Sequence, residues 1–153
     1  MKSTPSPQSS PQSGDTADVL RINSARAADL ERLHPWFDEV SGRLPAAMRH
    51  GMRVALEEVV LNAAMHGFAL DGQDEITVQL HIDSGSAALS VEDSGRPFDP
   101  ATAAARQPPA QHLDAPPGGL GLVLLHHYCH DLTYERIVER NRLIMRFPFP
   151  ATG

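Results

Sequence analysis

Residues 56–68 read LEEVVLNAAMHGF and place three polar side chains in a segment otherwise suited to a protein core. Glu58, Asn62 and His66 recur at every fourth residue, which puts them along one stripe of an α-helix. A buried carboxylate and a buried amide destabilise a fold unless partners meet them. The spacing alone allows two interpretations: these side chains bind local backbone at the border of the core, or they bind a ligand.

The surrounding stretch, residues 44–68, predicts the best-defined helix of the chain. Pro45 suits the first helical turn and Gly67 suits the C-terminal cap. Glu57 is expected on the solvent side, so two adjacent glutamates have different surroundings. The apolar seam at steps of three and four consists of Met48, Met52, Ala55, Val59 and Ala63. The stripe of Glu58 starts at the edge of this seam and drifts onto it.

The remaining periodicity predicts five strands and two more helices. A first strand is expected at 18–25, at an edge of the sheet. Further strands are expected at 74–83 and 86–93, as a hairpin around Ser-Gly-Ser, and at 131–139 and 141–149. The helices are expected at 26–44, weakened or kinked by Pro35, and at 118–130. This order predicts an α+β fold, a two-layer sandwich of a mostly antiparallel mixed sheet with helices on one face.

The bulk composition limits the class of protein. The 153 residues suit one domain, expected at 17–150, after a Ser/Pro/Gln-rich tail (1–16) that cannot bury enough apolar surface to fold. A net charge of −6 argues against binding of nucleic acid or of a membrane surface. Cys129 is the single cysteine, and no apolar stretch is long enough to span a bilayer. These features predict a cytoplasmic protein.

Two further stretches contain groups that favour a nucleotide. In VEDSGRPFDP (91–100), Asp93 follows a strand and can accept a hydrogen bond from an exocyclic amine, while Gly95 lets backbone approach a flat ring. In PPGGLGL (116–122), three glycines open a helix, where backbone N–H groups favour phosphate. Each signal alone is common, because Asp-x-Gly is an ordinary turn.

The three stretches, in this order and at these intervals, resemble the N, G1 and G2 boxes of the GHKL ATPase superfamily, which shares the Bergerat ATP-binding fold. The forms LEEVVLNAAMHGF and DSGRPFDP are similar to those of the anti-sigma-factor serine/threonine kinases of the RsbW and SpoIIAB type. The resemblance covers residues 18–149.

The resemblance implies a role for each matching residue. Glu58 would be the catalytic carboxylate, and Asn62 would ligate the Mg²⁺ that bridges the ATP phosphates. Asp93 would bind the adenine amino group, with Gly95 admitting the ring. The residues implied in nucleotide binding are Asn62, His66, Asp93, Gly95, Gly119, Gly121 and Leu122.

The resemblance also implies an activity and partners. Members of this family transfer phosphate from ATP to a serine or threonine of a small, STAS-like anti-sigma-factor antagonist. The unphosphorylated antagonist competes with a sigma factor for the kinase, so the kinase sequesters sigma only after phosphorylation releases the antagonist. No direct contact with nucleic acid is implied. Members are often homodimers, and nothing in this chain defines a symmetric interface.

Two departures from the family pattern leave an alternative open. Pro117 stands where some members carry an arginine, so a cation near the terminal phosphate would have to come from Arg96, Arg106 or a partner. Residues 140–143 (RNRL) replace a Gly-Thr pair. The alternative is an ATP-binding regulatory protein of the same fold with little or no kinase activity. A histidine kinase is disfavoured because His34, beside Pro35, is in the wrong setting for a phosphoacceptor.

Two other segments have competing interpretations. The stretch from Arg96 to Pro117 is rich in Pro and Ala and is long for a loop, which is typical of a functional lid. His126, Cys129 and His130 share helical spacing, but no second ligand cluster accompanies them. A helix that packs Leu122, Leu125 and Cys129 and exposes its histidines explains this pattern better than a metal site.

Overall fold

The computed structural model describes residues 17–23, 27–66, 75–99 and 119–151. The predicted tail (1–16), Gly67 and all but the first residues of the predicted lid lie outside these ranges. The interpretations of those segments therefore remain predictions.

The order of elements agrees with the order expected from periodicity. Along the chain the elements are β1 (Asp18–Asn23), α1 (Ala27–Leu30), α2 (Leu33–Val40), the 3₁₀ helix η1 (Ser41–Arg43), α3 (Ala46–His66), β2 (Glu75–Ile82), β3 (Ser86–Asp93), α5 (Gly119–Tyr128), β4 (Asp131–Ile137) and β5 (Arg140–Pro148).

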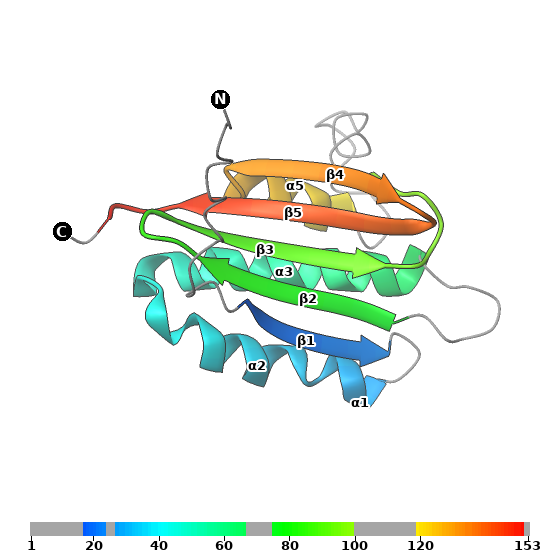
Figure 1. The fold of residues 1–153 in the computed structure, drawn as a ribbon, viewed down its shortest axis with the longest axis horizontal. Helices are drawn as coiled ribbons and strands as arrows, with labels where there is room; N and C mark the ends of the chain where they lie inside the picture. Colours follow the sequence, from blue (N-terminus) through cyan, green and yellow to red (C-terminus); the bar gives the residue numbers. More distant parts are fainter. Residues whose placement is uncertain (1–16, 24–26, 67–74, 100–118, 152–153) are drawn as a thin grey trace, which may run out of the picture.

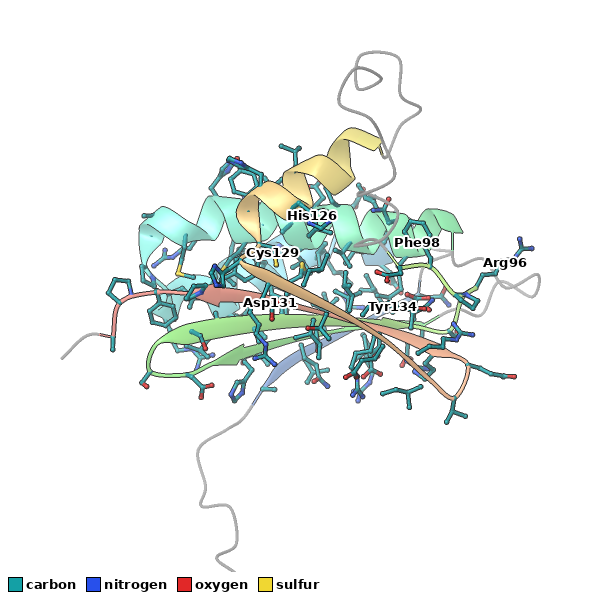
Figure 2. All side chains as sticks on the ribbon, turned by 90° about the horizontal axis from the view of Figure 1, so that it is seen from above. Arg96, Phe98, His126, Cys129, Asp131 and Tyr134 are labelled. Carbon is teal, nitrogen blue, oxygen red and sulfur yellow. The ribbon has the colours of Figure 1, made fainter. Side chains whose placement is uncertain are left out.

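The five strands form one sheet in the order β1-β2-β3-β5-β4, and every described pairing is antiparallel. β1 is an edge strand, as expected. The helices α3 and α5 lie on one face of this sheet (Figure 1), and the view from above shows the opposite face without a helix among the described elements (Figure 2). The expected α+β sandwich with helices on one face is confirmed.

The sheet is two-faced because its strands alternate. In β5 the residues Asn141, Leu143, Met145 and Phe147 are buried, while those between them are more exposed. β2 and β3 alternate in the same way. The inner row ends at Asp93 on β3 and at its direct partner Asn141 on β5. The polar residues of interest therefore terminate an otherwise apolar layer.

The first helical region is two helices and not one. α1 ends at Leu30, a turn follows, and α2 begins at Leu33. Pro35 has no N–H to donate to the carbonyl of Glu31, so a continuous helix would lose that hydrogen bond and meet the proline ring. Restarting at Leu33 places Pro35 in a first turn, where its missing donor costs little.

α3 crosses the sheet with the predicted seam facing inward. Met52, Ala55 and Val59 are buried, and Met48 and Ala63 pack partly buried against the core. α5 packs against α3, and the close approach depends on Gly51. A Cβ added at Gly51 would lie 2.6 Å from Cδ1 of Tyr128.

β4 and β5 are joined by a two-residue turn in which Val138 (φ 42°) and Glu139 (φ 61°) both have left-handed backbone. This is the geometry of a hairpin turn whose twist matches the strands. Within the described ranges, no helix is long and apolar enough to cross a lipid bilayer.

Candidate functional site

A row of three cross-strand partners ends the inner face of the sheet. Asp93 of β3 lies opposite Asn141 of β5, which lies opposite Arg136 of β4. Asp93 and Asn141 are 9% and 6% exposed, so both polar side chains sit in the core layer. The next row inward is Val91, Leu143 and Tyr134, which provides an apolar floor beside the polar row.

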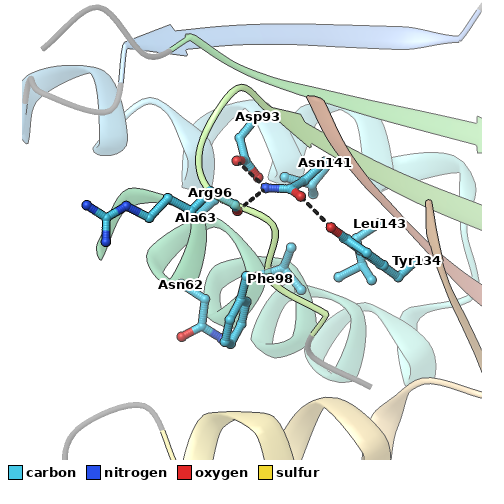
Figure 3. A pocket seen from close by; sticks show the side chains of 10 residues that line it. Asn62, Ala63, Asp93, Arg96, Phe98, Tyr134, Asn141 and Leu143 are labelled. Carbon is cyan, nitrogen blue, oxygen red and sulfur yellow. Dashed lines mark hydrogen bonds between the residues drawn. The ribbon is translucent and has the colours of Figure 1, made fainter. Parts of the chain in front are cut away.

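Asn141 is the centre of the hydrogen bonding in this row (Figure 3). Its Nδ2 donates to Oδ1 of Asp93 at 2.9 Å and to the backbone carbonyl of Arg96 at 2.7 Å. Its Oδ1 accepts from the hydroxyl of Tyr134 at 2.6 Å and from Nη1 of Arg136 at 3.0 Å. Nδ2 of this amide thus has two acceptors and Oδ1 has two donors, so all of its hydrogen-bonding capacity is satisfied within the protein.

The turn that follows β3 is fixed by the same groups. The N–H of Gly95 donates to Oδ1 of Asp93 at 2.9 Å, and Nη1 of Arg136 donates to the carbonyl of Gly95 at 2.7 Å. Oδ1 of Asp93 therefore accepts two hydrogen bonds. Its Oδ2 is the second acceptor oxygen of the same carboxylate, and Asp93 lines the cavity described next.

A cavity separates this row from α3. It is lined by Val59, Asn62 and Ala63 of α3, by Val91, Asp93, Tyr134, Asn141 and Leu143 of the sheet, and by Arg96 and Phe98 of the turn. In Figure 3, Phe98 lies beside Asn62, and the side chain of Arg96 extends away from Asp93 and Asn141. The cavity measures about 30 Å³. That is room for a water molecule, whereas ligand pockets are usually about 300 Å³ or more.

Asn62 is the polar group on the opposite wall. It is 4% exposed, and its Nδ2 has no hydrogen-bond partner among the described residues. A buried amide without a partner destabilises a fold, so it marks a place where a ligand can supply one. The amide oxygen is also the hard, neutral ligand type that Mg²⁺ accepts. The side chain therefore fits a metal-bound polyphosphate.

Glu58 lies one helical turn before Asn62 but does not line the cavity. Partial burial, and then the charge of neighbouring Glu57, raise the pKa of the Glu58 carboxyl. Glu57 itself pairs with His34 of α2 at 3.6 Å. The two glutamates thus have different neighbours, although both are only partly buried. The raised pKa of Glu58 suits a general base.

The glycine-rich stretch also begins a helix as predicted, with Gly119 as the first residue of α5 and Gly121 in its first turn. α5 packs against α3, so this helix start belongs to the same side of the sheet as Asn62. The side chains of His66 and Leu122 lie outside the part of the chain that the structure describes.

The histidines at the end of α5 agree with the interpretation as a packed helix. Leu125 is fully buried, whereas His126 and His127 are exposed. Burial raises the pKa of the Cys129 thiol, and its Sγ donates to the carbonyl of Asp131 at 2.9 Å. In the described ranges, no three metal-binding side chains come together.

Asn141, Tyr134 and Arg136 belong to the site but were not among the residues singled out from the sequence. One signal was available. In RNRLIMRF (140–147), strict alternation places Asn141 on the same face as Leu143 and Met145, and a polar residue on a buried face requires partners.

Three comparisons with known proteins agree with this geometry. Residues 23–147 match the family model of the histidine kinase-like ATPase domain. Over 131 residues the chain is 30% identical to the serine/threonine-protein kinase BtrW of Bordetella bronchiseptica, covering 84% of this chain and 91% of BtrW. That relative's name agrees with the kinase class expected from the sequence.

Two solved structures share the fold. One is the histidine kinase domain of the blue-light activated histidine kinase EL346 of Erythrobacter litoralis (TM-score 0.52, 18% identity, 84% of this chain and 62% of that one). The other holds the RsbU and RsbW domains of Rv1364c from Mycobacterium tuberculosis (TM-score 0.51, 18% identity, 88% of this chain and 34% of that one). The chain thus spans less than two thirds of either structure, and this likeness concerns the fold alone. Because the family model matches most of the length of this chain, the chain belongs to the histidine kinase-like ATPase domain family.

Proposed function

We propose that this protein is an ATP-dependent serine/threonine-protein kinase whose nucleotide lies between α3 and the ends of β3 and β5. The observation that carries the proposal is a pair of buried polar groups on opposite walls of one cavity. They are the carboxylate of Asp93 and the amide of Asn62, whose Nδ2 has no partner among the described residues. The family match and the relative named a serine/threonine-protein kinase support the same reaction class.

Adenine fits the sheet side of the cavity. Oδ2 of Asp93 would accept a hydrogen bond from the exocyclic amine, and Val91, Leu143 and Tyr134 supply an apolar surface for the ring. Because the cavity is only about 30 Å³, Phe98 must move outward before a purine can enter. Nucleotide binding should therefore be coupled to a rearrangement at Phe98, beyond the two residues whose carbonyls are held by the β4–β5 hairpin.

The phosphate side would be organised by Asn62 and the start of α5. When bound, Mg²⁺ would neutralise phosphate charge and orient the terminal phosphate. Asn62 would hold it through the amide oxygen. The backbone N–H groups that begin α5, at Gly119 and Gly121, are suited to phosphate oxygens.

Glu58 would receive the proton of the attacking serine or threonine hydroxyl. Its raised pKa makes it a better proton acceptor than an ordinary exposed glutamate. It lies one turn from Asn62 and outside the cavity that would hold the base, so in this proposal it would lie beside the phosphates. His66, at the end of the same helix, remains a predicted nucleotide contact.

For partners, we propose a cytoplasmic switch between a small STAS-like antagonist, which would be the phosphorylated substrate, and a sigma factor held by the kinase. This choice rests on the resemblance of the three sequence stretches to the anti-sigma-factor kinases. The relative named a serine/threonine-protein kinase supports the reaction class only. A homodimer is proposed on the family resemblance alone.

Phosphotransfer and nucleotide binding, measured separately, test the proposal. The purified chain with Mg-ATP is expected to label a serine or threonine of a small cognate antagonist. Asp93→Asn should weaken ATP binding at least about tenfold, because the amide presents a donor toward the adenine amine. Glu58→Gln should bind ATP normally and lose transfer. Thermal denaturation of both variants without nucleotide controls for the fold.

Two results would redirect the conclusion. Absence of any heat of association between wild type and millimolar ATP or ADP would remove the nucleotide site. Tight ATP binding without transfer to any antagonist would favour the alternative of a regulatory ATP-binding protein. Two features favour this alternative: Pro117 stands where some family members carry an arginine, and Glu58 lies outside the cavity.

A further inference from the structure

We propose that the β4–β5 hairpin acts as a clamp on the base-binding turn, and that Asn141 and Arg136 are positioning residues that set the preference for a purine with a 6-amino group. The inference rests on the proposed nucleotide site and adds to it the residues that determine its specificity. Neither residue would touch the nucleotide. Both would act through Asp93 and the backbone of the turn after β3.

The first support is the convergence of two side chains on two successive carbonyls. Arg136 binds the carbonyl of Gly95 at 2.7 Å, and Asn141 binds the carbonyl of Arg96 at 2.7 Å. Both donors come from the hairpin, more than 40 residues away along the chain. The turn is therefore held at the point where Gly95 would admit a flat ring.

The second support is that the amide of Asn141 has only one satisfactory orientation. The hydroxyl of Tyr134 and Nη1 of Arg136 converge on its Oδ1, while Oδ1 of Asp93 and the carbonyl of Arg96 accept from its Nδ2. The reversed amide would face Arg136 with a donor and Asp93 with an acceptor. The hairpin thus fixes a donor toward Asp93.

Specificity follows from this fixed donor. Oδ1 of Asp93 already accepts from Asn141 and from the N–H of Gly95, so the ligand is assigned to the other oxygen of the carboxylate, Oδ2, which is an acceptor. An exocyclic amine satisfies that oxygen, whereas a 6-oxo group opposes it. Asp93 and Asn141 are both more than nine-tenths buried, so water cannot readily substitute for a lost partner.

The test compares Arg136→Gln with Arg140→Gln, measuring the affinities of ATP and inosine triphosphate by calorimetry. Both substitutions remove one positive charge from the same hairpin. Arg140 lies 3.5 Å from Glu92 and takes no part in the hydrogen bonds to the turn. Wild type is expected to prefer ATP. Arg136→Gln should reduce the ratio of the two affinities about tenfold, and Arg140→Gln should leave it unchanged.

Two more variants extend the test. Asn141→Ala should also reduce the ratio, and Arg136→Lys, which keeps one donor, should restore part of it. If Asn141→Ala does not fold, the Arg136 variants alone test the clamp. Arg136 is an exposed residue of β4, so its replacement should leave the protein folded. A role in folding alone would lower the melting temperature without changing the ratio of affinities.

The outcomes separate the two proposals. If wild type binds neither nucleotide, the proposed function fails. If wild type prefers ATP and every Arg136 and Asn141 variant keeps the same ratio, the clamp is refuted while the kinase site stands.

Discussion

Asp93 and Asn141 are direct cross-strand partners on the inner face of the sheet, and the adjacent pair, Glu92 and Arg142, is joined on the outer face by a 2.6 Å bond from Nε to Oε1. Two successive cross-strand pairs of β3 and β5 thus lie on opposite faces of the sheet. The outer pair is only partly exposed, and ion pairs at the protein surface contribute little to stability. The inner pair lines a cavity, so changes to it should affect ligand binding as well as stability.

Asn62 and Asn141 are both buried asparagines, yet they should respond oppositely to replacement by leucine. Asn62→Leu removes an amide whose Nδ2 has no described partner, so the free energy of unfolding without nucleotide should rise by about 1–2 kcal/mol while ATP binding is lost. Asn141→Leu leaves Asp93 and the other hydrogen-bond partners of Asn141 unsatisfied, so the free energy of unfolding should fall by at least about 2 kcal/mol. Urea denaturation measures both, and a less stable Asn62→Leu would contradict this account.

Glu58→Gln should stabilise the fold in a pH-dependent way. The raised pKa of Glu58 means that the folded chain disfavours its charged form. Below its ordinary pKa of 4.5 the carboxyl is protonated in folded and unfolded chains alike, so wild type and variant should match. As the pH rises through the folded pKa, wild type should lose stability relative to the variant. The gain should stay below about 1 kcal/mol because the side chain is only partly buried.

Unfolding free energies measured from pH 4 to pH 8 check this expectation. A Glu58→Gln variant less stable than wild type at neutral pH would show instead that the charged carboxylate has a favourable partner in the folded protein.

Gly51→Ala should destabilise the protein although alanine favours helices. The new Cβ would lie 2.6 Å from the Tyr128 ring, so α3 and α5 would have to move apart, at a cost of about 1–3 kcal/mol. The matched control is Gly42→Ala, because nothing lies within 4 Å of a Cβ at that position. The control should be neutral or slightly stabilising. Equal melting temperatures for the two variants would argue against the close approach of Tyr128.

Replacing the residues of the β4–β5 turn should make the protein more stable. Val138 and Glu139 have left-handed backbone, which a branched side chain adopts with strain, and Val138 is 88% exposed, so little packing would be lost. Replacing the pair by Asn-Gly should raise the free energy of unfolding by about 1–2 kcal/mol. Thermal and urea denaturation check the gain. A loss of stability would mean that these side chains have contacts that outweigh the strain.

The elements that could be predicted from the sequence are those with a clear period. The seam of Met52, Ala55 and Val59 identified α3, and alternation identified the hairpin of β2 and β3, because each pattern reflects one buried face. The break before α2 was misplaced since Pro35 was considered as a kink within one helix. The proline is tolerated once the helix restarts two residues before it.

The site was less predictable because its geometry depends on contacts distant in sequence. Asp93 could be singled out by its place after a strand and before a glycine. Asn141 could not be joined to it until the register of β3 and β5 was known, since the two are 48 positions apart. The departure at residues 140–143 was interpreted as a loss relative to the family, whereas this segment provides Asn141. The narrowness of the cavity depends on where Phe98 packs, which no local pattern indicates.

The position of β5 has a consequence for biosynthesis. Among the described strands it is the last to leave the ribosome, yet it inserts between β3 and β4. Until residues 140–148 have emerged, Asp93 lacks the amide that orients it and β3 presents an open edge, which is a template for aggregation. A chain arrested during translation should therefore be recognised by chaperones or proteases before it can capture a nucleotide, so that occupancy of the site reports a finished domain.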